Sequence, residues 1–135
     1  MNRRLEYPRS VDLEADDPSP EELRLRLCEA VDRARRARLA VLTVHHAAAG
    51  PNRSLAEKVL RELRLKRLLG GTIGGVDFSE NSYSTRVALC LHPDLAAHPC
   101  LNRGERGVTL AFLGSKPMDL RGRRFRFQRR EGEQN

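Results

Sequence analysis

The chain has 135 residues, enough for one domain that buries a core without help from disulfides or metals. Its formal charge is +7, with 25 Lys and Arg residues against 18 Asp and Glu residues. Because guanidinium groups match phosphate geometry, this balance favours a polyanionic partner, first of all nucleic acid, over a surface that is merely charged and solvated. Aromatic residues make up only 4% of the chain, which argues against base stacking as the main binding mode.

The cysteines, Cys28, Cys90 and Cys100, are odd in number and form no C-x-x-C pair. This argues against a disulfide framework and predicts a reducing compartment. Cys90 is expected to be buried as a small hydrophobe, and Cys28 to lie near the apolar stripe of a helix. No run approaches a membrane span and no secretory signal is evident, so we expect neither a membrane partner nor secretion.

Residues 1–18 are predicted to form an extended N-terminal arm, because they are rich in proline and acidic residues and contain little to bury. A capping box, Ser19-Pro20-Glu21-Glu22, then predicts a helix that ends near Ala37. Arginines gather in its last turns, an arrangement that the helix dipole favours and that also suits contact with phosphate. A single α/β domain is expected over residues 19–120.

Residues 38–44 form a short apolar run rich in β-branched residues, which predicts a buried strand. The following loop contains Gly50-Pro51-Asn52, a turn combination. A second capping box, Ser54 with Glu57, predicts the start of the next helix, which presents a basic outer face.

Gly70-Gly71 is expected to end this helix, because helices commonly end at a residue in the αL conformation, which glycine adopts easily. A glycine-rich strand is predicted over residues 72–78, with Gly74 and Gly75 permitting a bulge or the close approach of another backbone. A phosphate-loop interpretation of these glycines is weaker, because they lack the Lys-Ser or Lys-Thr of a P-loop and precede a strand.

Residues 83–91 are compatible with either a strand or a short helix, and Pro93 ends the element in both cases. Another strand is predicted over residues 107–113. The tail, residues 121–135, contains six arginines between positions 121 and 130, with Phe125 and Phe127 alternating among them. It is either an edge strand or an arm along phosphates. No internal repeat is recognised.

Zinc and nuclease chemistry are weaker hypotheses. The zinc-type ligands Cys90, His92, His98 and Cys100 lack the paired spacing of structural zinc sites. His45-His46 follows a strand end, where a loop hydrogen bond is commoner than a catalytic base. A metal-dependent nuclease would have to draw on the scattered carboxylates Asp77, Glu80, Asp94, Glu105 and Asp119.

The central helix ends in Leu60-Arg-Glu-Leu63-Arg-Leu65-Lys-Arg67, with Thr72-Ile73 following. This pattern, in the order strand, basic loop, helix and strand over residues 39–95, resembles the L-thirty family of large-subunit ribosomal proteins in its bacterial and mitochondrial forms. In that family an Asn/Asp-Thr-Pro turn leads into a second helix; here Glu80 to Arg86 stands in its place without the Pro. The resemblance covers under half of the chain, so the remaining residues would be extensions.

The resemblance implies a non-enzymatic RNA-bound protein of a ribosome, in the mitochondrial matrix or the cytoplasm, with rRNA and neighbouring ribosomal proteins as partners. A non-catalytic subunit of another phage or organelle assembly and a small nuclease are the alternatives. We expect an α+β fold, with two helices on one face of a small mixed or antiparallel sheet, and neither cofactor nor small-molecule substrate. The candidate RNA-binding residues are Arg53, Lys58, Arg61, Arg64, Lys66, Arg67, Arg121, Arg123, Arg124, Arg126, Arg129 and Arg130.

Overall fold

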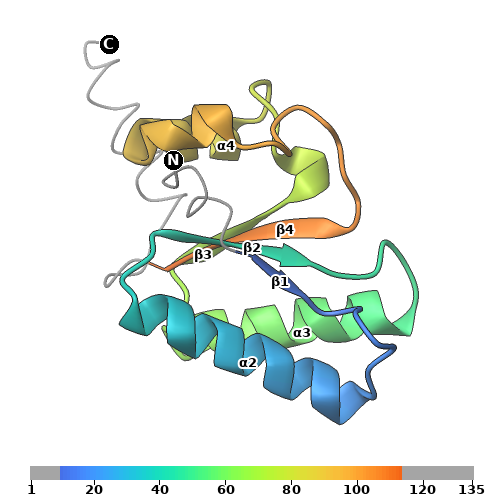
Figure 1. The fold of residues 1–135 in the computed structure, drawn as a ribbon. Helices are drawn as coiled ribbons and strands as arrows, with labels where there is room; N and C mark the ends of the chain where they lie inside the picture. Colours follow the sequence, from blue (N-terminus) through green and yellow to red (C-terminus); the bar gives the residue numbers. More distant parts are fainter. Residues whose placement is uncertain (1–9, 114–135) are drawn as a thin grey trace, which may run out of the picture.

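A mixed four-stranded sheet forms the middle of three layers (Figure 1). The computed structural model describes residues 10–113, so the tail from residue 121 lies outside the described part. The strands are β1 (Ser10–Asp12), β2 (Val41–His45), β3 (Gly71–Gly74) and β4 (Val108–Phe112), in the spatial order β1-β2-β4-β3. β1 pairs in parallel with β2, whereas β4 runs antiparallel to both of its neighbours.

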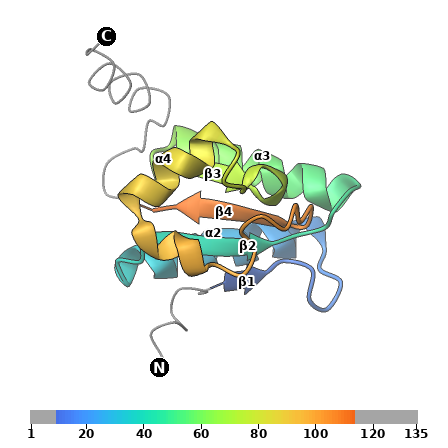
Figure 2. The ribbon, with the colours of Figure 1, turned by 90° about the horizontal axis from the view of Figure 1, so that it is seen from above.

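Helices cover both faces of this sheet, as two perpendicular views show (Figures 1 and 2). α2 (Pro20–Arg36) and α3 (Pro51–Leu65) lie side by side on one face. α4 (Tyr83–Leu91) and a 3₁₀ turn, Pro93–Ala97, cover the other face. The predicted α+β class, with a mixed sheet and two helices on one face, is confirmed. The ambiguous run over 83–91 is a helix, because the Ser82 side chain caps it by accepting from the Thr85 N–H.

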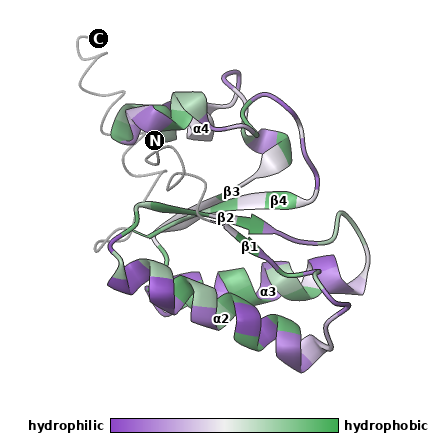
Figure 3. Ribbon diagram, viewed as in Figure 1, coloured by the Kyte–Doolittle hydropathy of each residue, from purple (hydrophilic) through white to green (hydrophobic). Residues whose placement is uncertain are grey.

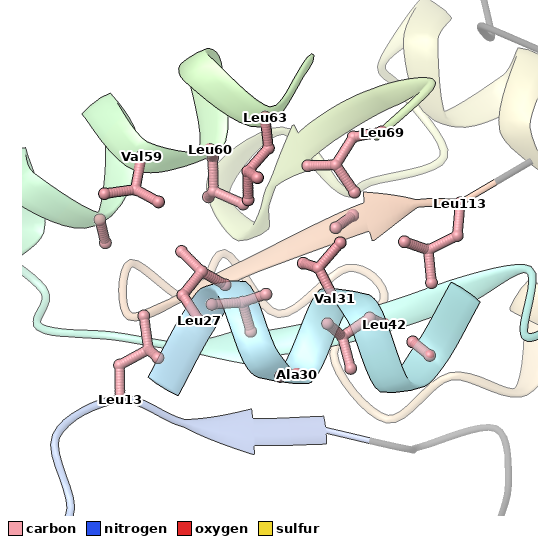
Figure 4. Packing of buried hydrophobic residues seen from close by; sticks show 14 of the residues in the cluster. Leu13, Leu27, Ala30, Val31, Leu42, Val59, Leu60, Leu63, Leu69 and Leu113 are labelled. Carbon is pink, nitrogen blue, oxygen red and sulfur yellow. The ribbon is translucent and has the colours of Figure 1, made fainter. Parts of the chain in front are cut away.

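Each face of the sheet has its own hydrophobic cluster. Leu42 and Val44 of β2 pack with the buried leucines and valines of α2 and α3 (Figure 4). Val41 belongs to the cluster on the α4 side, together with Phe78 and Phe112. All five residues of β4 are buried, because β4 is flanked by strands and covered on both faces.

The expected N-terminal arm is part of the fold from residue 10 onward. Ser10–Asp12 adds β1 to the edge of the sheet, and Leu13 is fully buried against α2 and α3. Arg26 holds the segment by donating from Nη1 to the carbonyl oxygens of Asp12 and Ala15, at 3.2 and 2.8 Å. The prediction of a free arm is wrong from residue 10 onward, because Val11 and Leu13 pack on the core and Ser10–Asp12 pairs with β2.

The predicted capping box at Ser54 is wrong, whereas the one at Ser19 is confirmed in both of its hydrogen bonds. The N-cap of α3 is Gly50, four residues before Ser54, with φ of 90°, and the helix begins at Pro51. Proline is pre-organised for the first helical position, and glycine tolerates that positive φ, so the helix starts at the earlier signal. Glu57 instead accepts from Arg53 Nε at 2.9 Å.

The strand predicted over residues 72–78 is shorter than expected. β3 ends at Gly74, and Gly75–Asp77 forms a 3₁₀ turn. The cause is a close backbone approach at Gly75, where a Cβ would overlap the carbonyl oxygen of Glu105. The predicted close approach of another backbone is therefore confirmed at Gly75, whereas a Cβ at Gly74 would lie in open space.

Candidate nucleic-acid interface

Charge is unevenly distributed along the layer formed by α2 and α3. Both helices run in the same direction, so their C-terminal ends lie at the same side of the molecule (Figure 1). Residues 33–38 and 61–67 contain eight cationic side chains and one carboxylate, Glu62. The first ten residues of α2, 20–29, contain three acidic and two basic side chains. Hydrophilic residues recur along the surface of both helices in Figure 3.

We call this group of eight cations the basic end. All eight side chains are exposed. Arg35 donates from Nη1 to the carbonyl oxygen of Leu68 at 3.1 Å, and Arg36 pairs with Asp32 at 3.0 Å. Within the described residues, the side chains of the other six make no hydrogen bond or ion pair. The basic end consists of Arg33, Arg35, Arg36, Arg38, Arg61, Arg64, Lys66 and Arg67.

Five of the predicted RNA-binding residues share the exposed surface of α3 and the turn that follows it. They are Lys58, Arg61, Arg64, Lys66 and Arg67. Arg53 differs from them, because its side chain is engaged within the protein. Its Nη1 donates to the carbonyl oxygens of Ala48 and Arg106, at 2.9 and 3.0 Å, while its Nε bonds Glu57. The geometry assigns Arg53 to holding the loop before α3. The six tail arginines of the prediction lie outside the described residues.

Both helices of the layer end in the same hydrogen-bond motif. After α2, the Arg38 N–H bonds the Arg35 carbonyl and the Leu39 N–H bonds the Ala34 carbonyl, both at 3.0 Å. After α3, Arg67 bonds Arg64 and Leu68 bonds Leu63, both at 2.9 Å. These are Schellman motifs, in which the residue at C′ adopts the left-handed conformation. The two corners therefore have equivalent geometry.

The residue at C′ is arginine in both corners, where glycine is usual. Arg38 has φ of 60° and Arg67 has φ of 64°. The left-handed region costs a non-glycine residue roughly 1–2 kcal/mol. Gly70-Gly71, expected to end α3, instead follows that corner, with the Gly70 N–H bonding the Phe112 carbonyl at 2.7 Å. The expected stop at the glycines is wrong because Leu68 packs on the core and fixes the corner earlier.

An ion pair connects the first half of α2 to the carboxylate that lies among the cations of α3. Arg24 Nη1 lies 2.7 Å from Glu62 Oε1. The hydrogen bond from Arg24 lowers the pKa of the Glu62 carboxyl, and the charges of Lys58 and Lys66 lower it further. The only carboxylate among residues 61–67 is thus already engaged by a cation of α2, so it neutralises little of the basic end.

The predicted zinc ligands have separate partners. Cys90 is exposed on α4, contrary to the prediction that it is buried, because the buried side of this helix is formed by residues such as Thr85 and Ala88. His92 stacks on Phe112. His98 and Cys100 are buried, and the Cys100 N–H donates to His98 Nδ1 at 3.0 Å.

Metal-binding candidates do not converge within the described residues. Between residues 10 and 113, no group of three or more His, Cys, Asp or Glu side chains is placed to hold a metal ion. The nuclease candidates within that range, Asp77, Glu80, Asp94 and Glu105, are all exposed. Asp119 lies outside it.

Two buried histidines each bond a threonine of the sheet. His46 Nδ1 donates to the Ala47 carbonyl at 2.9 Å, so its Nε2 accepts from Thr109 Oγ1 at 2.8 Å. His98 accepts at Nδ1 from Cys100, so neutral His98 carries its proton on Nε2 and donates it to Thr43 Oγ1 at 2.9 Å. Burial, assisted by the charge of His45, lowers the pKa of His98 to about 4. These contacts are structural and satisfy polar groups within the core.

Comparisons of the chain with protein-family models, with curated proteins and with solved structures found no match. Function must therefore be argued from the molecule itself. Among residues 10–113, no helix has the length and apolar character that crossing a membrane requires.

The sequence alone does not reveal that the arginines of α2 join those of α3 in the basic end. The arginines at the end of α2 were interpreted equally as dipole partners and phosphate contacts. The signal that pairs them with α3 is a short pattern at the two helix ends, Ala34-Arg-Arg-Ala-Arg38-Leu39 and Leu63-Arg-Leu-Lys-Arg67-Leu68. In both, an apolar residue at position i is followed by Arg at i+1 and i+4 and by Leu at i+5. No repeat was recognised, because the pattern spans only six residues.

Proposed function

We propose that the chain is a non-catalytic protein that binds structured RNA through phosphates, using the basic end together with Lys58. The observation that carries this proposal is the concentration of exposed cations at one end of two adjacent helices, six of them without a partner in the described residues. Solvated cations at that density repel one another, and a phosphate backbone relieves this repulsion.

The helix dipole explains part of the arrangement, since cations near a C-terminus are favoured by about 0.3–1 kcal/mol each. That effect is confined to the last turn, whereas Lys58 and Arg61 lie further back on the same exposed side of α3. The surface is formed by two helices lying side by side, with few aromatic residues in the chain to stack on bases. Contact with phosphates and with the shape of a folded RNA suits such a surface better than readout of single-stranded bases.

The resemblance to the L-thirty family suggests a ribosome as the setting. The structure has the expected order of elements over residues 39–95, namely β2, α3, β3 and α4. We propose a large ribosomal subunit, organellar or cytoplasmic, as the assembly, with rRNA and neighbouring proteins as partners. Co-sedimentation with purified large subunits tests this setting, and loss of the chain from the subunit fraction at low salt would count against it.

RNA binding itself is tested by titrating the full chain into a labelled RNA hairpin at several salt concentrations. Five phosphate contacts predict a slope of log K against log salt of about −4 to −5, taking duplex DNA as the guide. The triple variant K58Q/R61Q/R64Q should make that slope less steep by about 3. A matched control, R86Q/R103Q/R106Q, removes three charges outside the layer formed by α2 and α3 and should change the slope little. A slope that is flat in the wild-type chain would refute RNA binding.

A further inference from the structure

Among the cations of the basic end, Arg38 and Arg67 occupy equivalent positions. Each is the C′ residue of a Schellman motif, each has a left-handed backbone, and each side chain is exposed without a hydrogen bond or ion pair in the described residues. Glycine would satisfy the backbone at both positions without strain. The backbone therefore gives no reason for arginine here, and the reason lies with the side chains.

The two corners are held next to each other. Arg35, three residues before Arg38, donates to the carbonyl oxygen of Leu68, the residue after Arg67, at 3.1 Å. Leu39 and Leu68, which follow the two arginines, both pack against the same hydrophobic cluster. The backbone at each corner is thus fixed by two hydrogen bonds and an apolar anchor, and the two are joined by a third side chain.

Two neighbouring arginines suit a chain of phosphates better than one isolated anion. The fixed backbone at each corner sets the position from which the arginine side chain extends. Each guanidinium can then bind one phosphate in a bidentate way. The negative ends of the helix dipoles oppose an anion here, but each end carries only about half an elementary charge. Residues 33–38 alone contribute four positive charges, so the local field remains favourable to a phosphate backbone.

We propose that Arg38 and Arg67 form a two-point clamp that contacts phosphates of one RNA backbone, with Arg35 as the residue that positions the two corners. The inference rests on the proposed RNA-binding function and adds to it the residues that fix the register of the RNA on the helical layer. Lys58 and Arg61 then supply further contacts along α3.

The test uses the double variant R38G/R67G of the full chain. Glycine relieves the left-handed strain, so the Tm should rise by several degrees. Affinity for the RNA hairpin should nevertheless fall, on the order of 50-fold at about 0.1 M salt, with a slope less steep by about 2. The conservative variant R38K/R67K keeps the charge and the strain and should retain the slope, while losing the part of the affinity that bidentate geometry supplies.

The matched control is R103Q/R106Q, which removes the same charge from an exposed loop outside the helical layer. Its affinity should remain close to that of the wild type. If R38G/R67G binds RNA no more weakly than this control, while K58Q/R61Q/R64Q still loses affinity, the clamp is refuted and RNA binding stands. If the wild-type chain itself shows a flat salt response, both the function and the clamp are refuted.

Discussion

Burial of His98 predicts that the fold loses stability in mild acid. The imidazole is 4% exposed, lies edge-on to Phe78 and uses both ring nitrogens, accepting from the Cys100 N–H and donating to Thr43 Oγ1. Protonation would place a second proton at Nδ1, facing an N–H donor, so the charged form is opposed by both desolvation and hydrogen bonding. This agrees with the lowering of its pKa from 6.5 to about 4.

The magnitude follows from linkage between protonation and folding. Between pH 6.5 and pH 4, the unfolded chain binds a proton at His98 that the folded chain does not, so the free energy of unfolding falls as the pH falls. At about 1.4 kcal/mol for each unit of pKa, the whole window corresponds to roughly 3 kcal/mol, and the step from pH 7 to about pH 4.5 to roughly 2 kcal/mol. His92, whose pKa burial also lowers, contributes in the same direction.

The assay is urea unfolding of the wild-type chain and of His98→Gln at pH 7, 6, 5 and 4.5. Glutamine retains a donor toward Thr43 but does not titrate. Its free energy of unfolding should therefore be lower than that of the wild type at pH 7 and fall less on acidification, by about 2 kcal/mol. His92→Gln serves as a second variant that isolates the smaller contribution. Equal pH dependence in the wild type and His98→Gln would refute the assignment of a buried neutral imidazole.

Three further substitutions test the fold by chemical or thermal denaturation. Leu13→Ala should destabilise the protein by about 2–5 kcal/mol, because Leu13 is fully buried. An unchanged denaturation midpoint would mean that residues 10–13 belong to an extended arm, as the sequence predicted. Gly75→Ala should lower the Tm markedly, since its Cβ would overlap the Glu105 carbonyl; Gly74→Ala, with open space around its Cβ, is the matched control, and equal effects would contradict the close approach. Ser19→Ala should remove about 1 kcal/mol by deleting the cap of α2, with Ser54→Ala near neutral; the reverse order would restore the box at Ser54.

Local signals predicted some elements well. The Ser19 capping box and the apolar spacing of α2 specify that helix within the segment itself, and the buried run over residues 107–113 reads as a strand because both of its faces are covered. The predicted start of α3 is wrong because two possible N-caps, Gly50 and Ser54, lie four residues apart. The choice between them depends on the φ of Gly50, which a sequence does not show.

Other features depend on contacts distant in sequence. The run over 83–91 is apolar enough for either class, and its helical state is reinforced when Thr85 Oγ1 donates to the Asp77 carbonyl at 2.7 Å. The engagement of Arg53 involves Arg106, 53 residues away. The basic end likewise exists only once α2 and α3 lie side by side. Exposure of the individual basic residues of α3 was predictable from periodicity, but their association with the arginines of α2 was not.

The position of β4 has a consequence for the order in which the chain can fold. β2 and β3 are not neighbours in the sheet. β4 lies between them and pairs with both. During synthesis, α2, β2, α3 and β3 emerge well before residues 108–112, and until then the strand that bridges β2 and β3 is missing. The pairing of Val41 with Phe112 closes a loop of about 70 residues, a long-range contact of the kind that slows folding. Completion of the sheet therefore awaits the last strand, and the helical layer carrying the basic end acquires its final support only at that step.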